Sequence, residues 1–257
     1  MSLSSGSNGN CYWLEGSRGG ILIDAGVSLR ALKTGLQAHG IPMERIKAVI
    51  VTHDHSDHIR NLGSYCKKLL VPVWVTETLR HSTPMGWMTG PWLSPVVHIL
   101  QPGIQTEILP GSISVSAFEV PHDATQTLGY AIDIDGYKLV IMTDIGQMTP
   151  EALAFAGKAS TVIIEANYDP VMLANGPYPP DLQARIRGGY GHLANFECAE
   201  AVKTFRHEGL ANVFLCHLSA HNNTPETALD TVRPALEGSG VRLVALPRTE
   251  PSPMFEL

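Results

Sequence analysis

The stretch Thr52-His53-Asp54-His55-Ser56-Asp57-His58 decides the fold expected of this chain. It follows a short apolar run, 48–51, that is typical of a buried strand. Three of the 11 histidines lie within this stretch, and functional side chains are common on loops that a rigid sheet supports. Neutral imidazoles and carboxylates that converge from so short an arc are metal ligands, so the stretch predicts a metal site. The alternative is a solvated polar loop.

Strands and helices alternate along the rest of the chain. Apolar or alternating runs predict strands at 21–23, 48–52, 73–76, 113–120, 128–134, 138–143, 161–166, 212–216 and 241–246. Helices are expected from a cap at Ser28 to about residue 39, over 57–69 and 195–208, and after Thr224-Pro225. Asp135-Gly136 predicts a hairpin, and the Pro-, Gly- and Trp-rich segment 84–110 predicts a long surface loop or lid. Two β-rich halves flanked by helices favour an α/β fold, a four-layer αββα sandwich.

Length and composition indicate one globular domain over 1–257. The chain has 257 residues, of which 44% are hydrophobic and 16% charged, so it can bury a large core. Its longest apolar runs are far shorter than the roughly 20 residues that cross a bilayer. Residues 1–7 lack the basic and apolar regions of a secretory signal, so a cytoplasmic location is expected. The four cysteines form no CxxC pair and are expected to be reduced thiols.

The net charge limits the partners that the chain can attract. It is −6, from 18 Lys+Arg against 24 Asp+Glu, so the field of the whole protein repels a polyanion. A nucleic-acid substrate would need local positive charge. Bound divalent cations could supply that charge, because several of the counted carboxylates would be metal ligands.

The order of metal-ligand residues resembles that of a known family. His53-x-His55-x-Asp57-His58 is similar to the metal motif of the metallo-β-lactamase superfamily, and the strand and turn 21–26 are similar to those upstream of it. The resemblance implies one metal on His53, His55 and His122, a second on Asp57, His58 and His217, and Asp144 as the bridge between them. Five histidines and two aspartates suit Zn²⁺, Mn²⁺ or Fe²⁺ better than Mg²⁺ or Ca²⁺.

Three further segments resemble the YycJ (WalJ)-like branch, which is related to RNase J and tRNase Z. They are SSGSNGNC at 4–11, GHLAN at 191–195, where the branch has Ser in place of Ala194, and NNTPE at 222–226. The resemblance implies a 5′-to-3′ exonuclease that acts on DNA rather than RNA. The β-CASP insertion of RNase J and the long arm of tRNase Z are not evident, which disfavours both of those activities.

The resemblance also implies catalytic roles. In the phosphodiesterase members a His at the position of His192 acts beside the metals, with an acidic partner at the position of Glu165. Two metal ions can lower the pKa of a shared water, and the resulting bridging hydroxide, held by Asp57, would attack phosphorus. His192, steadied by Glu165, would protonate the departing oxygen. Capping of the following helix is the alternative role for His192.

Several residues are candidates for contact with the substrate or with the metal ligands. Ser and Asn side chains near the N-terminus could face the metals or a phosphate, and basic and aromatic residues before His192 could touch a nucleic-acid chain. The predicted substrate contacts are Ser5, Ser7, Asn8, Asn10, Arg185, Arg187 and Tyr190. Asp24 could accept a hydrogen bond from a ligating imidazole, or fix a turn. The Trp87–Trp92 region could line a groove or form a homo-oligomer interface.

Two other classes of function stay open at this point. A thioesterase or lactonase uses the same metal chemistry on a carbonyl group. A catalytically silent metal-binding scaffold is also compatible with the fold, because fold does not fix function. The intact ligand set favours an enzyme over the scaffold.

Overall fold

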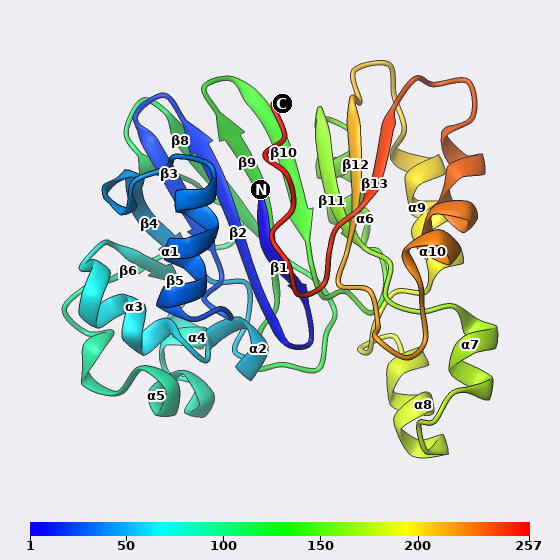
Figure 1. Cartoon of the computed structure of the whole chain (residues 1–257), viewed down its shortest axis with the longest axis horizontal. Helices are drawn as coiled ribbons and strands as arrows, with labels where there is room; N and C mark the ends of the chain where they lie inside the picture. Colours follow the sequence, from blue (N-terminus) through cyan, green and yellow to red (C-terminus); the bar gives the residue numbers. More distant parts are fainter.

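The computed structural model describes residues 1–257 and contains two β-sheets that face each other, with helices on their outer sides (Figure 1). The largest core cluster joins side chains of both sheets, among them Leu22 and Val49 from one and Ile132 and Phe214 from the other. A second core cluster lies between the other face of the second sheet and its helices. The αββα sandwich predicted from the sequence is confirmed.

The first sheet has six strands in the order β1-β2-β3-β4-β5-β6. Their bounds are β1 Ser2–Gly6, β2 Gly9–Gly16, β3 Gly19–Ile23, β4 Ile46–Ile50, β5 Val73–Val75 and β6 Val97–Ile99. The first three are antiparallel, and β3 to β6 run parallel. β3 and β4 are apolar and almost wholly buried, as parallel strands covered on both faces must be.

The second sheet has seven strands in the order β13-β12-β11-β10-β9-β8-β7. Their bounds are β7 Gln105–Leu109, β8 Ile113–Glu119, β9 Leu128–Ile134, β10 Tyr137–Met142, β11 Thr161–Glu165, β12 Asn212–Cys216 and β13 Arg242–Ala245. β7 to β10 are antiparallel, and β10 to β13 run parallel. Asp135 and Gly136 turn between β9 and β10 with positive φ angles of 52° and 91°, which confirms the hairpin predicted there.

Helices cover both sheets and begin at the expected caps. Their bounds are α1 Leu29–Ala38, α2 Ser56–Ile59, α3 Leu62–Leu69, α4 Glu77–Arg80, α5 Thr83–Thr89, α6 Pro150–Ala156, α7 Pro170–Asn175, α8 Pro180–Arg187, α9 Asn195–Phe205 and α10 Pro225–Val232. The Ser28 and Thr224 side chains accept hydrogen bonds from backbone N–H groups of α1 and α10, so both predicted caps are confirmed. No helix combines the length and the apolar character needed to span a bilayer.

The loop predicted over 84–110 is wrong. This segment contains α5, a short 3₁₀ turn Gly90–Trp92, and strands β6 and β7. Ser82 caps α5 by accepting from Met85 N, and β6 extends the parallel edge of the first sheet beside β5. Its strands are short and partly exposed, so they carry little of the apolar pattern that marks a strand.

The N-terminal segment and the helix predicted over 57–69 also differ from expectation. Residues 2–16 form the hairpin β1–β2, whereas the apolar pattern predicts no strand before residue 21. The helix is broken into α2 and α3 at Asn61, whose backbone leaves the helical region. The Asn61 amide donates to Gly26 O, so the break ties α2 to the turn after β3.

Candidate metal centre

The candidate ligands lie where parallel strands end. His53 follows β4, Asp144 follows β10, and His217 follows β12. β10, β11 and β12 are parallel neighbours, so their carboxyl ends meet at one edge of the second sheet. The loop after β4 and helix α2 bring the histidine stretch to the same end of the molecule, where α2 and α8 lie in Figure 1.

The ligands predicted for two metals come together in overlapping groups. Donor atoms within each group lie within 4.8 Å of one another. The groups are His53, His55 and His122; Asp57, His58 and His217; His53, His58 and Asp144; and Asp144, Glu165, His192 and His217. Asp144 lies close to the histidines of both predicted metal sites. Its Oδ2 lies 3.1 Å from His58 Nε2, and its Oδ1 lies 3.7 Å from His122 Nε2.

Each of the five imidazoles has one ring nitrogen held by a hydrogen bond, and its other ring nitrogen lies among the donor atoms of the cluster. Four of them are held at Nδ1, and His55 is held at Nε2. The pairs are His53 with Thr52 Oγ1 (3.0 Å), His58 with Asp24 Oδ2 (2.7 Å), His122 with Gly191 O (2.7 Å), His217 with Glu165 Oε1 (2.9 Å) and His55 with Asp123 O (3.2 Å). Such partners fix the tautomer and orientation of metal-binding histidines.

The donor set fits divalent cations. His53 Nε2, Asp144 Oδ2 and His217 Nε2 are buried polar atoms with no hydrogen-bond partner. An unpaired buried polar atom costs about 1–3 kcal/mol, so three such atoms in one cluster suit a bound cation. A cation bound by these atoms would satisfy all three.

Neighbouring charges and burial shift the pKa values of the clustered side chains. Burial lowers the pKa of His58, but three neighbouring carboxylates, that of Asp144 foremost, outweigh it and raise this pKa to about 10. Burial would raise the pKa of Asp144, yet His217 and His58 hold it well below its usual range. The pKa of His53 is lowered well below its ordinary value, first by burial and then by the His58 charge.

Asp24 has both of the roles considered for it. It is fully buried with a φ of 63°, and its Oδ1 accepts from Thr52 N at 2.8 Å, which fixes the turn after β3 against β4. Its Oδ2 accepts from His58 Nδ1 at 2.7 Å. Asp24 therefore aims His58 Nε2 at the cluster.

We expect Asp24→Ala to lower metal affinity by about 10–100-fold, because the His58 imidazole loses the carboxylate that orients it. The measurement is zinc affinity by competition with a chelator of known affinity. Asp133→Ala, a partly exposed aspartate on β9, is the control and should bind as the parent does. An Asp24→Ala protein with parental affinity would contradict this role.

His192 and Glu165 form the predicted pair. His192 Nδ1 donates to Glu165 Oε1 at 2.8 Å, and the His192 side chain keeps 24% of its surface exposed, whereas Glu165 is fully buried. Burial lowers the pKa of His192, but the Glu165 carboxylate outweighs it, and the net shift is upward. Glu165 also accepts from His217 Nδ1, so one carboxylate orients a metal ligand and the candidate acid.

Ser5 and Asn10 were expected to face the metals or a phosphate, and the structure places both beside the metal ligands. Both are fully buried. Asn10 Nδ2 donates to Asp57 Oδ2 at 3.1 Å and lies 2.9 Å from His58 Nε2. Ser5 Oγ accepts from His217 N at 2.9 Å. They therefore hold the metal ligands, because the β1–β2 hairpin folds beneath the cluster.

The contact from Ser5 supports a strained backbone. His217 has a φ of 53°, which is uncommon for a residue other than glycine. We expect Ser5→Ala to reduce the free energy of unfolding by about 1–3 kcal/mol, because the buried His217 N–H loses its acceptor. Urea denaturation measures this, with the exposed Ser7→Ala as the control that should change it by less than about 0.5 kcal/mol. Equal stability of the two variants would contradict the role of Ser5.

The remaining predicted contacts lie at the surface. Ser7 and Asn8 are exposed at the tip of the β1–β2 hairpin. Arg187 is exposed, and Tyr190 has 67% of its surface exposed. These positions leave all four side chains free to meet a ligand.

Arg185 is ion-paired to a residue that the sequence analysis missed. Its Nε donates to Asp123 Oδ2. Asp123 Oδ1 lies 3.7 Å from His55 Nε2 and 3.6 Å from His122 Nε2. The signal available was the position of Asp123 directly after His122, but no pattern linked it to Arg185, 62 residues away.

Comparison with known proteins identifies the family. The family described as the beta-lactamase superfamily domain matches residues 20–218, which include every candidate ligand. The chain belongs to the beta-lactamase superfamily. This membership, with the intact ligand cluster, makes it a metal-dependent hydrolase, as the resemblance implied.

Similar proteins agree with the YycJ (WalJ)-like branch of the superfamily. The chain is 31% identical to exodeoxyribonuclease YycJ of Bacillus anthracis, over 93% of this chain and 89% of that protein. It is 32% identical to exodeoxyribonuclease WalJ of Streptococcus pneumoniae, over 88% of this chain and 83% of that protein. The metallo-β-lactamase fold protein YhfI of Bacillus subtilis shares the fold, with a TM-score of 0.70 at 16% identity, over 96% of this chain and 95% of that chain.

Proposed function

We propose that this protein is a dinuclear metal-dependent exonuclease that releases nucleotides from the 5′ end of DNA. The observation that carries the proposal is the His192–Glu165 pair, which shares Asp144 and His217 with the candidate metal cluster. A phosphodiester has a poor alkoxide leaving group, so a proton donor beside the metals suits this substrate. The similarity to proteins named exodeoxyribonucleases supports DNA as the substrate.

Seven side chains would hold two cations. His53, His55 and His122 form one donor group, Asp57, His58 and His217 form the other, and Asp144 lies between them. When bound, two divalent ions would lower the pKa of a shared water and neutralise charge on the phosphate. The mixture of imidazole and carboxylate donors favours Zn²⁺ or Mn²⁺.

The chain's own residues position the reacting groups. Asp57 is held by Asn10 through Oδ2, and its side chain is 17% exposed, so it can accept a hydrogen bond from an attacking water. His192 is held by Glu165 at Nδ1, which leaves Nε2 to give a proton to the departing oxygen. Near His55 and His122, Arg185 is anchored at Nε by Asp123. Its terminal N–H groups are therefore left to meet a substrate phosphate.

A time course on several substrates tests this function. The purified Mn²⁺-loaded protein is incubated with end-labelled duplex DNA, with single-stranded RNA and with a thioester, and the Asp57→Ala variant is the control. We expect nucleotides to be released from the DNA 5′ end only while Asp57 is present. Thioester turnover with intact nucleic acids would overturn the substrate assignment, and absence of any turnover with metals bound would favour a binding protein.

A further inference from the structure

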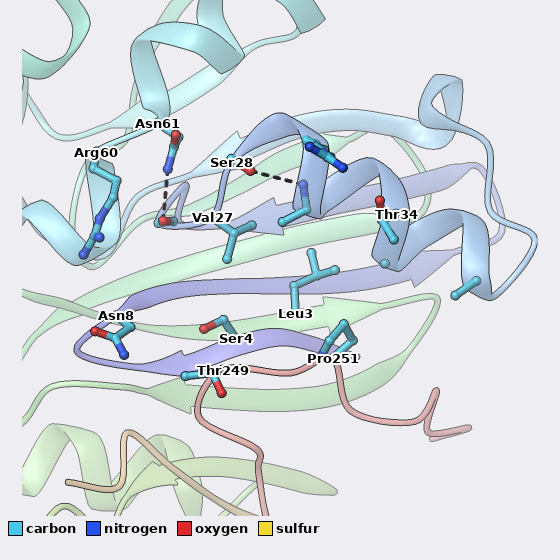
Figure 2. Close-up of a pocket in the computed structure, with 15 residues that line it drawn as sticks. Leu3, Ser4, Asn8, Val27, Ser28, Thr34, Arg60, Asn61, Thr249 and Pro251 are labelled. Carbon is cyan, nitrogen blue, oxygen red and sulfur yellow. Dashed lines mark hydrogen bonds between the residues drawn. The ribbon is translucent and has the colours of Figure 1, made fainter. Parts of the chain in front are cut away.

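An open depression lies along helix α1. It has a volume of about 800 Å³ and lies between helix α1, the β1–β2 hairpin and the segment around Thr249 and Pro251 (Figure 2). Figure 2 shows Arg60, Asn61 and Asn8 toward one end of it and Thr34 toward the other. We call it the α1 groove. None of the residues assigned to metal binding or catalysis lines it.

The charge of the α1 groove is opposite to that of the whole protein. Its 15 lining residues include Arg30 and Arg60 and no Asp or Glu. Glu250 is adjacent in sequence to two lining residues but does not line the groove. The chain carries a net charge of −6, so a groove with two cationic and no anionic side chains is a local exception.

Neither arginine is neutralised within the protein. Arg60 donates only to main-chain oxygens, those of Ser56 at 3.3 Å and Ser7 at 3.5 Å. Arg30 is exposed on α1, and its guanidinium makes no hydrogen bond or ion pair, in contrast to Arg45 and Arg185, which pair with carboxylates. Guanidinium groups without a carboxylate partner, in a groove lined by no carboxylate, are suited to phosphate oxygens.

The lining also indicates which part of a nucleic acid fits. It contains no Trp, Tyr, Phe or His, so the α1 groove offers no platform on which a base could stack. Its polar groups include Asn8, Ser28, Thr34 and Thr249. Such a surface recognises the sugar-phosphate backbone and is indifferent to sequence.

One end of the α1 groove is built by the segments that build the metal centre. Arg60 ends helix α2, which carries Asp57. Asn8 lies on the hairpin tip two residues before Asn10, whose amide contacts Asp57. Gly26 joins the two segments closely, because a Cβ there would lie 1.9 Å from Asp57 O. A chain leaving the metal centre on this side would meet Arg60 first.

We propose that the α1 groove binds the sugar-phosphate backbone of the DNA substrate beyond the bond that is cleaved, with Arg30 and Arg60 each contacting a phosphate. The inference rests on the proposed nuclease function and extends it. The two arginines give the negatively charged protein a cationic surface that leads toward the metal centre. Binding there would depend on phosphate charge and not on base sequence.

Salt-dependent binding tests the proposal. Metal-loaded Arg30→Ala, Arg60→Ala and the double variant are compared with the parent by fluorescence anisotropy, on a duplex whose 5′ linkages are hydrolysis-resistant phosphorothioates. We expect each substitution to weaken binding by roughly threefold and to lower the slope of log affinity against log salt by about one, additively in the double variant. Parental affinity and slope in the double variant would overturn the proposal.

Two matched variants separate this contact from general effects. Lys33→Ala removes a charge from the same helix but outside the α1 groove, and it should bind as the parent does. Arg30→Lys keeps the charge and should keep the parental salt slope. If Lys33→Ala weakens binding as much as Arg30→Ala, the effect is one of net charge and the α1 groove is not a specific site. Hydrolysis of unmodified DNA by the parent protein tests the nuclease function separately.

Discussion

Replacement of Asp57 by alanine is expected to lower hydrolysis by about 10⁴-fold or more, because bound cations, which would lower the pKa of water to about 7, would lose a ligand. Asp57 Oδ2 lies 3.5 Å from His58 Nε2 and 3.7 Å from His217 Nε2, so its carboxylate completes the second donor group. Its side chain is also partly exposed, as its proposed role in holding the attacking water requires. The loss therefore affects metal binding and orientation together.

The Asp57 experiment uses steady-state rates on duplex DNA with saturating metal. Ser56→Ala is the control, since Ser56 lies in the same stretch with an exposed side chain that makes no contact in the cluster. It should retain the parental rate. An Asp57→Ala protein within tenfold of the parent would mean that the second donor group has no part in catalysis.

His192→Ala is expected to slow hydrolysis of an unactivated phosphodiester by about 10²–10⁴-fold, the usual loss for a general acid. The imidazole is fixed by Glu165 at 2.8 Å and retains an exposed edge, which is the geometry needed to protonate a departing oxygen. The loss should shrink on a chromogenic ester whose leaving group needs no proton. That difference separates proton donation from a structural role.

His221→Ala is the matched control for His192. His221 is exposed near Tyr178 and belongs to no donor group. Its replacement should leave both rates unchanged. Undiminished activity of His192→Ala on the unactivated ester would rule out the general-acid role, and an equal loss on both esters would indicate a structural one.

Local sequence pattern was enough to predict the strands that carry the site and most of its metal ligands. Strands β9 and β12 have the predicted bounds, because compact apolar runs between turn signals leave little choice. Asp144, Glu165 and His217 converge because they lie at the carboxyl ends of neighbouring parallel strands, which meet at one edge of the second sheet. The stretch from His53 to His58 contains four of the seven predicted metal ligands, so a single local motif predicted most of the site.

Contacts between distant segments could not be predicted in the same way. Three of the five residues of β1 are serines, and its strand character depends on pairing with β2 and with the chain near Arg248. The role of Ser5 beneath His217 spans 212 residues, and no local pattern encodes it. The α1 groove is likewise formed by four separate segments. Tertiary packing decides all three features.

The measurement that tests the account most directly is the number of metal ions bound per chain, by elemental analysis of the parent, Asp144→Ala and His192→Ala proteins after dialysis. Asp144 lies between the two donor groups, and His192 is proposed to act on substrate. We expect about two ions in the parent and in His192→Ala, and fewer in Asp144→Ala. One ion in the parent, or two in Asp144→Ala, would contradict a dinuclear centre bridged by Asp144.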